Sequence, residues 1–263
     1  MCIRDRALGV DCLIVLKDTV ELLNLSPADF VDKFLMAAIR PSVVVEGRDF
    51  NFGYGRSGNV QTLAQLGAER GFEVIVAAPR EVELVQAGRG GRAICSSSLA
   101  RMCIAEGRVA EARQVLGRFY RLIGKTTPGR GIGRQLGFPT ANMQPLEQIV
   151  PAEGVYAGFV AAGETPEALC LPSSTRPAAL SIGRAKTFVS DHPLLVEAHI
   201  LEEEVEDLAG KWLAMDFVER LRPQRRFEEH EDLKRQIARD CRQARQILDD
   251  IAAEDTEVAE IDE

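Results

Sequence analysis

The sequence predicts an α/β domain with a parallel sheet, followed by a small antiparallel β-barrel with a C-terminal helix. Two observations carry this prediction. In the first ninety residues, short runs of Val, Ile and Leu alternate with segments of helical periodicity, which is the pattern of a parallel sheet covered on both faces. From about Arg118, several short apolar runs are separated by Gly, Pro and Ser, which is typical of a small barrel.

The first domain is expected to alternate strands and helices. The run ALGVDCLIVL (residues 7–16) is short and apolar, which predicts a buried strand. SPADFVDKFLMAAIR (26–40) predicts a helix with Ser26 as its N-cap and Pro27 in its first turn. The same reasoning predicts a strand at 41–47, a helix at 59–71 that Gly71 stops, and a strand at 72–79.

The second part of the chain changes character. Residues 96–117 predict two short helices, the second of which begins at Val109. Five β runs follow, at 119–126, 154–163, 178–183, 194–201 and 212–221. Residues 228–254 predict a long amphipathic helix, with an apolar stripe formed by Leu233, Ile237, Ala244, Leu248 and Ile251. The last ten residues are acidic, and a frayed end is expected there.

Composition and charge exclude several classes of function. The 263 residues carry a net charge of −8, whereas binding along nucleic-acid phosphates needs a surplus of Lys and Arg. The six cysteines form no CxxC pair, so neither a zinc framework nor a secreted disulfide scaffold is expected. No apolar run is long enough to span a membrane, and no signal peptide follows MCIRDR. These features predict a cytoplasmic protein with no nucleic-acid or membrane partner.

The stretch GRGIGRQLGFPTAN (129–142) is the most unusual in the chain, and it matches neither of the common phosphate loops. A Walker A loop would need glycine at Phe119, ahead of the GKT that begins at Gly124. A dinucleotide fingerprint opens a helix with GxGxxG, whereas the spacing here is GxGxG and Pro139 forbids a helix. What remains is a loop whose backbone N–H groups and arginines can surround phosphates.

Two side chains with oxygen ligands, Thr140 and Asn142, follow this loop. In an extended segment they point to the same side, because strand side chains alternate. A hydroxyl and an amide carbonyl on one side form a partial shell for Mg²⁺, which takes its other ligands from phosphates and water. Taken in isolation, however, the stretch is more typical of a glycine-rich hairpin followed by a Pro-Thr-Ala-Asn turn.

The order of the segments resembles that of the riboflavin kinase family. GRQLGFPTAN carries the resemblance most specifically, and GVYAG, SIGRAKTF, VEAHIL and DLKRQIARDCRQAR follow in the family's order. The upstream half resembles the nucleotidyltransferase domain of the bifunctional riboflavin kinase/FMN adenylyltransferases, the bacterial FAD synthetases. Its matching segments are LGVDCLIVL, VVVEGRDFNFGYGRSGNVQTL and SSSLARMCIAEGRVAEARQVLGRFY. The resemblance runs from Leu8 to about Leu248.

The resemblance implies phosphorylation of riboflavin to FMN by ATP, with Mg²⁺. It assigns Thr140 and Asn142 to the metal and the nucleotide phosphates, and Glu197 to the base that takes the proton from the riboflavin 5′-hydroxyl. The loop that covers the phosphates would be formed by Gly129, Gly131, Gly133, Arg134 and Gly137. Alternation in LLVEAHIL agrees with this role, since it separates Glu197 and His199 from the apolar face. His199 is interpreted as structural.

For the upstream half, the resemblance implies a Rossmann-like parallel sheet of a truncated nucleotidyltransferase. The remnant of its site would be formed by Asp49, Phe52, Gly53, Ser96, Ser97, Ser98 and Arg101. Ser98 stands where the family has threonine, and the HxGH segment, whose histidines stabilise charge on ATP, is absent from the sequence. Adenylylation of FMN to FAD is therefore expected of a full-length form and expected to be lost in this chain.

The expected domains are a truncated adenylyltransferase-like domain at 1–117, a riboflavin kinase domain at 118–252 and an acidic tail at 253–263. Limited proteolysis is expected to leave a fragment that starts near Arg118. Two family segments depart in the kinase domain: NPTF is AKTF at 185–188, and DLYG is DLAG at 207–210. Both departures bear on the fit of the flavin more than on phosphate chemistry.

Two readings from other classes stay open. The barrel is either a flavin- or nucleotide-binding module without turnover or an interaction barrel, if it is not an enzyme. Glu197, Thr140 and Asn142 argue against the binding module, because binding alone needs no base. The acidic balance and the PTAN motif, which has no role in an interaction barrel, argue against the second alternative. The sequence does not predict the oligomeric state.

Overall fold

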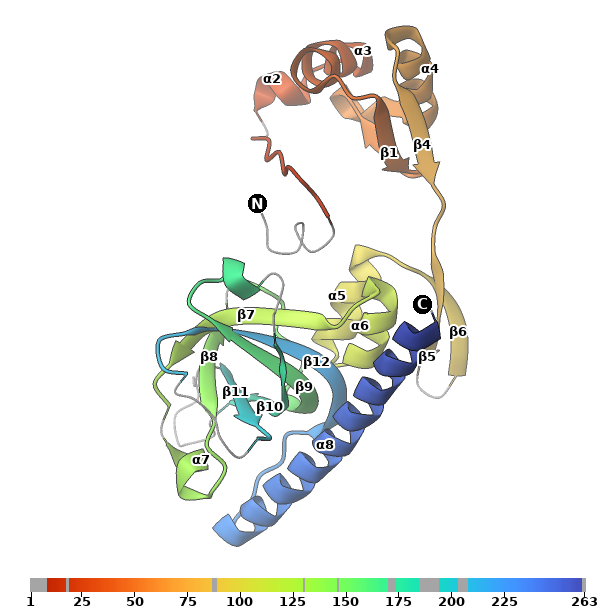
Figure 1. Cartoon of the computed structure of the whole chain (residues 1–263). Coiled ribbons are helices and arrows are strands. Elements are labelled where there is room, and N and C mark those ends of the chain that lie inside the picture. Colours follow the sequence, from red (N-terminus) through yellow and green to blue (C-terminus); the bar gives the residue numbers. More distant parts are fainter. Residues whose placement is uncertain are drawn as a thin grey trace. The chain divides into compact units, whose positions relative to one another are not determined.

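The computed structural model describes residues 9–17, 19–86, 89–129, 131–145, 147–169, 174–184, 194–202 and 208–261. Its contacts divide the chain into two compact units, which we call the N-terminal unit (Leu13–Glu81) and the barrel unit (Val82–Glu263, with Met1–Cys12) (Figure 1). This division lies upstream of the predicted domain boundary between residues 117 and 118.

The N-terminal unit contains the predicted helices and two of the predicted strands. Its elements are α2 (Val20–Leu23), α3 (Pro27–Asp29), η1 (Phe30–Ile39), β1 (Val43–Gly47), β2 (Asn51–Phe52), η2 (Tyr54–Arg56), β3 (Gly58–Asn59), α4 (Val60–Arg70) and β4 (Glu73–Ala77). β1 and β4 are parallel, as predicted, with Val45 opposite Ile75. Ser26 caps its helix through an Oγ that accepts a hydrogen bond from the Asp29 N–H, at 3.1 Å.

Two expectations for this unit are wrong. Residues 9–17 form no strand, and Val15 is 80% exposed. An apolar run becomes a strand only where a neighbouring strand takes its hydrogen bonds, and within the described residues β1 pairs with β4 alone. Within the described residues, the β1–β4 sheet is also covered on one face only. Val44 and Val74 pack against the helices, whereas Val45 and its partner Ile75 are 59% and 45% exposed.

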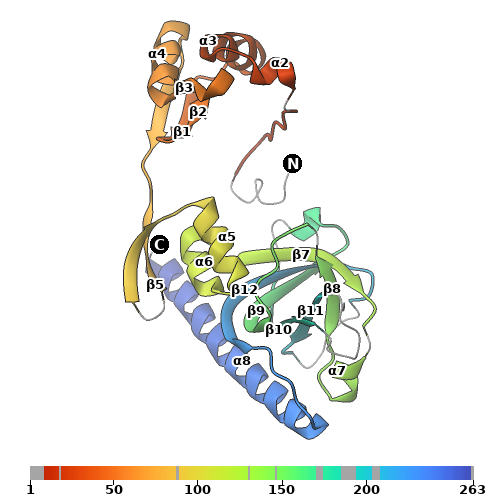
Figure 2. The same cartoon turned by 180° about the vertical axis from the view of Figure 1, so that it is seen from behind.

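The barrel unit is built on a closed antiparallel barrel, which confirms the predicted class. It has the strand order β10-β11-β8-β7-β12-β9 (Figures 1 and 2). The strands are β7 (Tyr120–Thr127), β8 (Ala141–Pro145), β9 (Gly154–Gly163), β10 (Arg176–Arg184), β11 (Leu194–Ile200) and β12 (Trp212–Pro223). Two short helices lie in its loops, α7 (Ile132–Gln135) and η3 (Glu167–Leu169). The helical turn α7 corrects the expectation that Pro139 excludes a helix from the glycine-rich stretch, since α7 ends before the proline.

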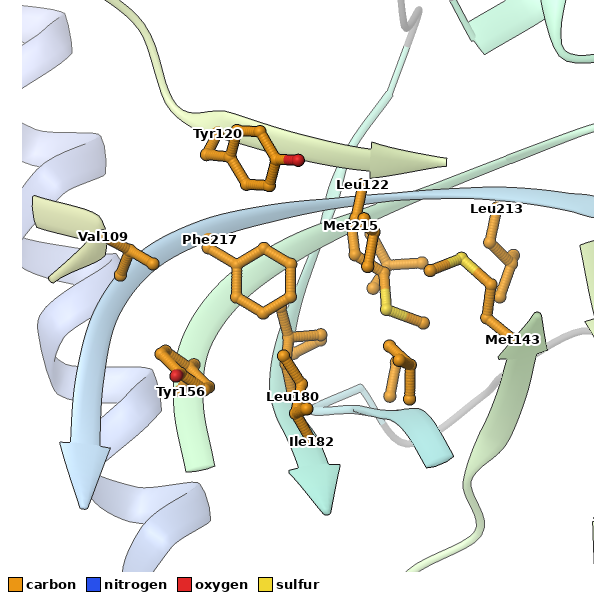
Figure 3. Packing of buried hydrophobic residues seen from close by; sticks show 14 of the residues in the cluster. Val109, Tyr120, Leu122, Met143, Tyr156, Leu180, Ile182, Leu213, Met215 and Phe217 are labelled. Atoms are coloured by element: carbon orange, nitrogen blue, oxygen red, sulfur yellow. The ribbon is translucent and has the colours of Figure 1, made fainter. Parts of the chain in front are cut away.

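Side chains from every strand fill the barrel interior, and Figure 3 shows part of this buried cluster. Phe217 and Met215 of β12 meet Leu180 and Tyr156 there, all fully buried. The Tyr156 and Phe217 rings meet edge to face, with centroids 5.3 Å apart. The interior is therefore a packed core and no ligand channel, so a binding site must lie at its mouth or on its outer face.

Three helices and a hairpin complete the unit. They are the hairpin β5 (Glu81–Gln86) and β6 (Arg89–Ile94), which was not predicted, α5 (Ser97–Ala105), α6 (Val109–Leu116) and α8 (His230–Ile261). Val109 and Ala112 of α6 belong to the buried cluster of the barrel. Both views show α8 lying along the outside of the barrel, where Ala244 and Leu248 are buried against strand residues (Figures 1 and 2). The backbone of α8 stays helical to Ile261, where a frayed end was expected.

A buried ion pair attaches α8 to the barrel. Asp240 accepts hydrogen bonds from Arg222 of β12, at 3.0 Å from Nε to Oδ1 and 2.7 Å from Nη2 to Oδ2. Their side chains are 5% and 11% exposed. Gln236 also donates to Asp240 Oδ1, at 2.8 Å. The carboxylate is thus fully partnered, and the pair fixes which face of α8 turns to the barrel.

Candidate active site

A cavity of about 1030 Å³ opens where β7, β8 and β11 meet α8. Its wall includes the end of β7, the glycine-rich loop, the start of β8, the end of β11 and one face of α8. Of the predicted nucleotide residues, the cavity is lined by Gly129, Arg134, Gly137, Thr140 and Asn142. Gly131 and Gly133 lie in the same loop outside the lining. Residues far apart in the sequence therefore share one pocket.

The glycines let the loop lie close to the two predicted metal residues. A Cβ on Gly129 would lie 2.1 Å from Asn142 Nδ2, and one on Gly133 would lie 3.1 Å from Thr140 Oγ1. Gly137 has a φ of 86°, which other residues rarely adopt. The glycines therefore let the loop backbone lie close to Thr140 and Asn142.

Four polar side chains form a continuous row across the outer face of four neighbouring strands. Register places Thr127 of β7 opposite Asn142 of β8, and Asn142 opposite Glu197 of β11. Glu197 in turn is opposite Ser181 of β10. Directly opposed residues point to the same side of a sheet, with Cβ atoms about 4.5–5.5 Å apart. We call Thr127, Asn142, Glu197 and Ser181 the polar row.

Glu197 stands at the edge of the pocket. Its neighbours Val196 and Ala198 are buried in the barrel core, while Glu197 is half-buried on the opposite face. It is not among the lining residues, but its register partner Asn142 is. The predicted face of Glu197 is therefore confirmed, and the row brings it next to the pocket.

His199, which the sequence reading treated as structural, lines the cavity. Its Nδ1 lies 2.8 Å from the carbonyl oxygen of Pro139, and its ring meets that of Phe138 edge to face at 5.4 Å. These contacts attach β11 to the residues just before Thr140. The sequence could have indicated this position, because His199 follows Glu197 by two residues, and residues i and i+2 of a strand share a face.

The described lining of the cavity carries more basic than acidic side chains. Arg134 comes from the loop, and Arg242 and Arg245 come from α8, while Glu202 is the one acidic residue among the described lining. Sequence reasoning missed both arginines of α8, since a long polar helix face gives no sign of what lies against it. Three guanidinium groups around one cavity favour an anionic ligand such as a polyphosphate.

Cys241 is poorly suited to act as a nucleophile. Cys241 also lines the cavity, but burial raises the pKa of its thiol to about 11. The thiol is therefore protonated at neutral pH, and the thiolate is the reactive form.

The donor set suits a hard cation that shares its shell with phosphate. Thr140 and Asn142 both line the cavity and supply neutral oxygens. Within the described residues, no group of three or more His, Cys, Asp or Glu side chains is arranged to hold a metal. A site of this kind fits Mg²⁺, which usually keeps waters and binds substrate phosphates.

The residues assigned to an adenylyltransferase site fall in both units. Phe52 is buried against the helices of the N-terminal unit, and Gly53 approaches Pro27 so closely that a Cβ would lie 2.8 Å from the Pro27 nitrogen. Asp49 has a side chain that is 96% exposed. In the barrel unit, Ser96 caps α5 by accepting from the Leu99 N–H at 3.2 Å.

The other three residues of that set are exposed on α5: Ser97, Ser98 and Arg101. The departures from the family's kinase segments are only partly visible. Residues 185–188 lie outside the described residues, as does Asp207, whereas Leu208 and Ala209 line the cavity. No helix in the described part of the chain is both long enough and apolar enough to cross a membrane.

The chain thus has a closed six-stranded barrel with a glycine-rich loop beside a cavity, and comparison with known proteins gives its family. The riboflavin kinase family model matches residues 116–248, and the FAD synthetase model matches residues 5–87. The bifunctional riboflavin kinase/FMN adenylyltransferase of Escherichia coli K12 is 30% identical over 91% of this chain and 71% of that protein. That of Pseudomonas fluorescens is 32% identical over 90% and 70%.

A solved structure agrees in fold. The crystal structure of a macrolide-efflux protein from Streptococcus pneumoniae matches 92% of this chain and 72% of that chain, with 25% identity and a TM-score of 0.74. With the family models and relatives, the conclusion is plain. The chain belongs to the family of bifunctional riboflavin kinase/FMN adenylyltransferases.

Proposed function

We propose that the barrel unit transfers the γ-phosphoryl group of ATP to the 5′-hydroxyl of riboflavin, giving FMN. The observation that carries this proposal is the polar row at the edge of the cavity. It sets a carboxylate, Glu197, directly opposite Asn142, whose amide lies against the glycine-rich loop. A base beside a phosphate-binding loop is the arrangement that phosphorylation of a hydroxyl requires.

Each residue has a distinct part. Backbone groups of the loop and Arg134 hold the triphosphate, and Arg242 and Arg245 complement negative charge from the other wall. Thr140 and Asn142 would hold Mg²⁺, which when bound would offset the negative charge that develops on the phosphates. Glu197 accepts the proton of the 5′-hydroxyl as that oxygen bonds to the γ-phosphorus. The bond between the γ-phosphorus and the oxygen that joins it to the β-phosphate breaks, and ADP leaves.

The first test compares the substitution of Glu197 with that of a control glutamate. Glu197→Gln keeps the shape of the side chain and removes the proton acceptor, so FMN formation should fall by about 10²–10⁴-fold while MgADP binding changes little. Glu219→Gln is the matched control, because Glu219 is an exposed glutamate of β12 that lies outside the cavity lining and the polar row. Its turnover should stay within about threefold of the wild type. Full activity of Glu197→Gln would remove this residue from the mechanism, and no FMN from the wild-type chain would refute the activity.

The second test concerns the metal residues. Thr140→Ala and Asn142→Ala each remove one oxygen ligand, so both should bind MgADP more weakly. Raising the Mg²⁺ concentration should restore part of their turnover, whereas it should leave Glu197→Gln unchanged. If the two alanine variants lost only thermal stability, the metal assignment would be wrong.

We further propose that the chain as given does not convert FMN to FAD. Its three histidines are His192, His199 and His230, so it contains no HxGH segment to supply charge at the α-phosphate of ATP. The test is incubation with FMN and MgATP, with separation of the flavins. FAD forming at a rate comparable to that of FMN from riboflavin would contradict this proposal.

A binding module without turnover is the alternative. It predicts that riboflavin and MgADP bind with normal affinity in the wild type and in Glu197→Gln, and that neither forms product. The same measurements therefore separate the two functions. We also propose that the protein is cytoplasmic and has no nucleic-acid partner.

A further inference from the structure

Ser181 ends the polar row on the side away from the cavity, and a specific contact fixes its hydroxyl group. Gln224, which follows β12, donates from Nε2 to Ser181 Oγ at 2.9 Å. The same nitrogen donates to the carbonyl oxygen of Ile182, at 3.1 Å. Both protons of the Gln224 amide nitrogen are thus committed to the middle of β10.

The surroundings are shaped for this contact. Gly183 would carry a Cβ 2.9 Å from Gln224 Nε2, so a larger residue there would displace the amide. Two residues before Gln224, Arg222 is anchored in its buried ion pair with Asp240. Gln224 is exposed, but its position is fixed at both ends. Arg222 anchors the backbone nearby, and the side-chain amide is hydrogen-bonded to β10.

The consequence falls on the neighbouring strand. Because Ser181 Oγ accepts a hydrogen bond from Gln224, its own proton is directed elsewhere. The residue directly opposite Ser181, on the same face of the sheet, is Glu197. We infer that Ser181, oriented by Gln224, is a positioning residue that donates a hydrogen bond to the Glu197 carboxylate and aims it at the substrate hydroxyl.

This inference rests on the proposed role of Glu197 and adds a residue that orients its carboxylate. Asn142 flanks the glutamate on one side and Ser181 on the other. A carboxylate used as a base must keep one oxygen directed at the proton that it accepts, and misplacement by about 1 Å can cost 10²-fold in rate. The outer flank of the row would supply that constraint without touching substrate.

The test uses Ser181→Ala, Ser181→Thr and Gln224→Met. Ser181→Ala should lower kcat by about 10-fold while the KM for MgATP and for riboflavin stays within twofold, since the residue lies outside the cavity lining. Ser181→Thr keeps the hydroxyl and should recover most of the rate. Gln224→Met keeps the length of the side chain without its donor and should give an intermediate kcat. Thr165→Ala is the control, since it removes a hydroxyl that bonds a backbone N–H elsewhere in the barrel unit.

A double variant separates positioning from stability. In Glu197→Gln, Ser181→Ala should have no further effect on the residual rate, because the group that it positions is gone. A structural role would instead lower the melting temperature and act equally in both backgrounds. If Glu197→Gln is slow but Ser181→Ala is as fast as the wild type, this inference fails alone. If Glu197→Gln is fully active, the proposed mechanism fails first.

Discussion

Gly129 illustrates how much of the site depends on a single missing side chain. Its hypothetical Cβ lies 2.1 Å from Asn142 Nδ2, a distance that real Cβ atoms do not reach, so Gly129→Ala must move the loop or turn the amide. We expect MgADP to bind at least 10-fold more weakly, while the melting temperature falls by only a few degrees because the loop lies outside the core. Isothermal titration and thermal unfolding measure the two quantities.

Gly91→Ala is the matched control for this change. Nothing lies within 4 Å of a Cβ at Gly91, so alanine there should leave MgADP binding unchanged. Equal losses in both variants would mean that the effect is not local to Asn142.

At the scale of elements, the connection of α8 to the barrel depends on Asp240. Asp240→Asn leaves the buried Arg222 without its counter-charge, and breaking a buried pair costs about 3 kcal/mol of the free energy of unfolding. Asp232→Asn on the same helix is the control, because Asp232 and Arg235 are 53% and 67% exposed. Its cost should stay below about 1 kcal/mol. Equal midpoints in urea for the two variants would contradict the importance of the buried pair.

The sequence predicted the secondary-structure elements better than it predicted which residues oppose each other on neighbouring strands. Short apolar runs separated by Gly, Pro and Ser identified five of the six barrel strands. Alternation placed Glu197 on the correct face of β11, because a period of two needs no tertiary information. The opposition of Glu197 to Asn142 and to Ser181 was not predictable, since register depends on how six strands close. The β5–β6 hairpin was not predicted, although EVELVQ alternates between apolar and polar residues.

Burial was the weakest prediction for the same reason. The apolar run of β1 predicts a strand covered on both sides, but a strand in itself does not determine what covers it. Val45 is exposed and Val44 packed, although the two residues are the same type in the same strand. Likewise, Arg242 and Arg245 read as a solvated helix face and lie at the cavity.

For the whole molecule, the division into units predicts where proteases cut. The boundary taken from the sequence predicts a resistant fragment that begins near Arg118, but α6 packs Val109 and Ala112 into the barrel core. The contacts divide the chain between Glu81 and Val82. Brief trypsin treatment should therefore cut after the exposed Arg80 and leave a fragment that begins at Glu81.

Mass spectrometry of the fragment decides between the two boundaries, with Arg80→Gln as the control that should delay its appearance. A first stable fragment beginning at Phe119 would favour the boundary taken from the sequence. The Glu81 fragment should keep the cavity intact and still bind MgADP.

The exposed face of the β1–β4 pair has a consequence for the stability of concentrated protein solutions. Val43, Val45 and Ile75 present water with an apolar stripe 43%, 59% and 45% exposed, which is a surface that adheres to others like it. The net charge of −8 keeps molecules apart at neutral pH through mutual repulsion. Acidification towards the isoelectric point, or salt that screens the charge, removes that repulsion while the stripe remains, so turbidity should rise in concentrated stocks kept mildly acidic.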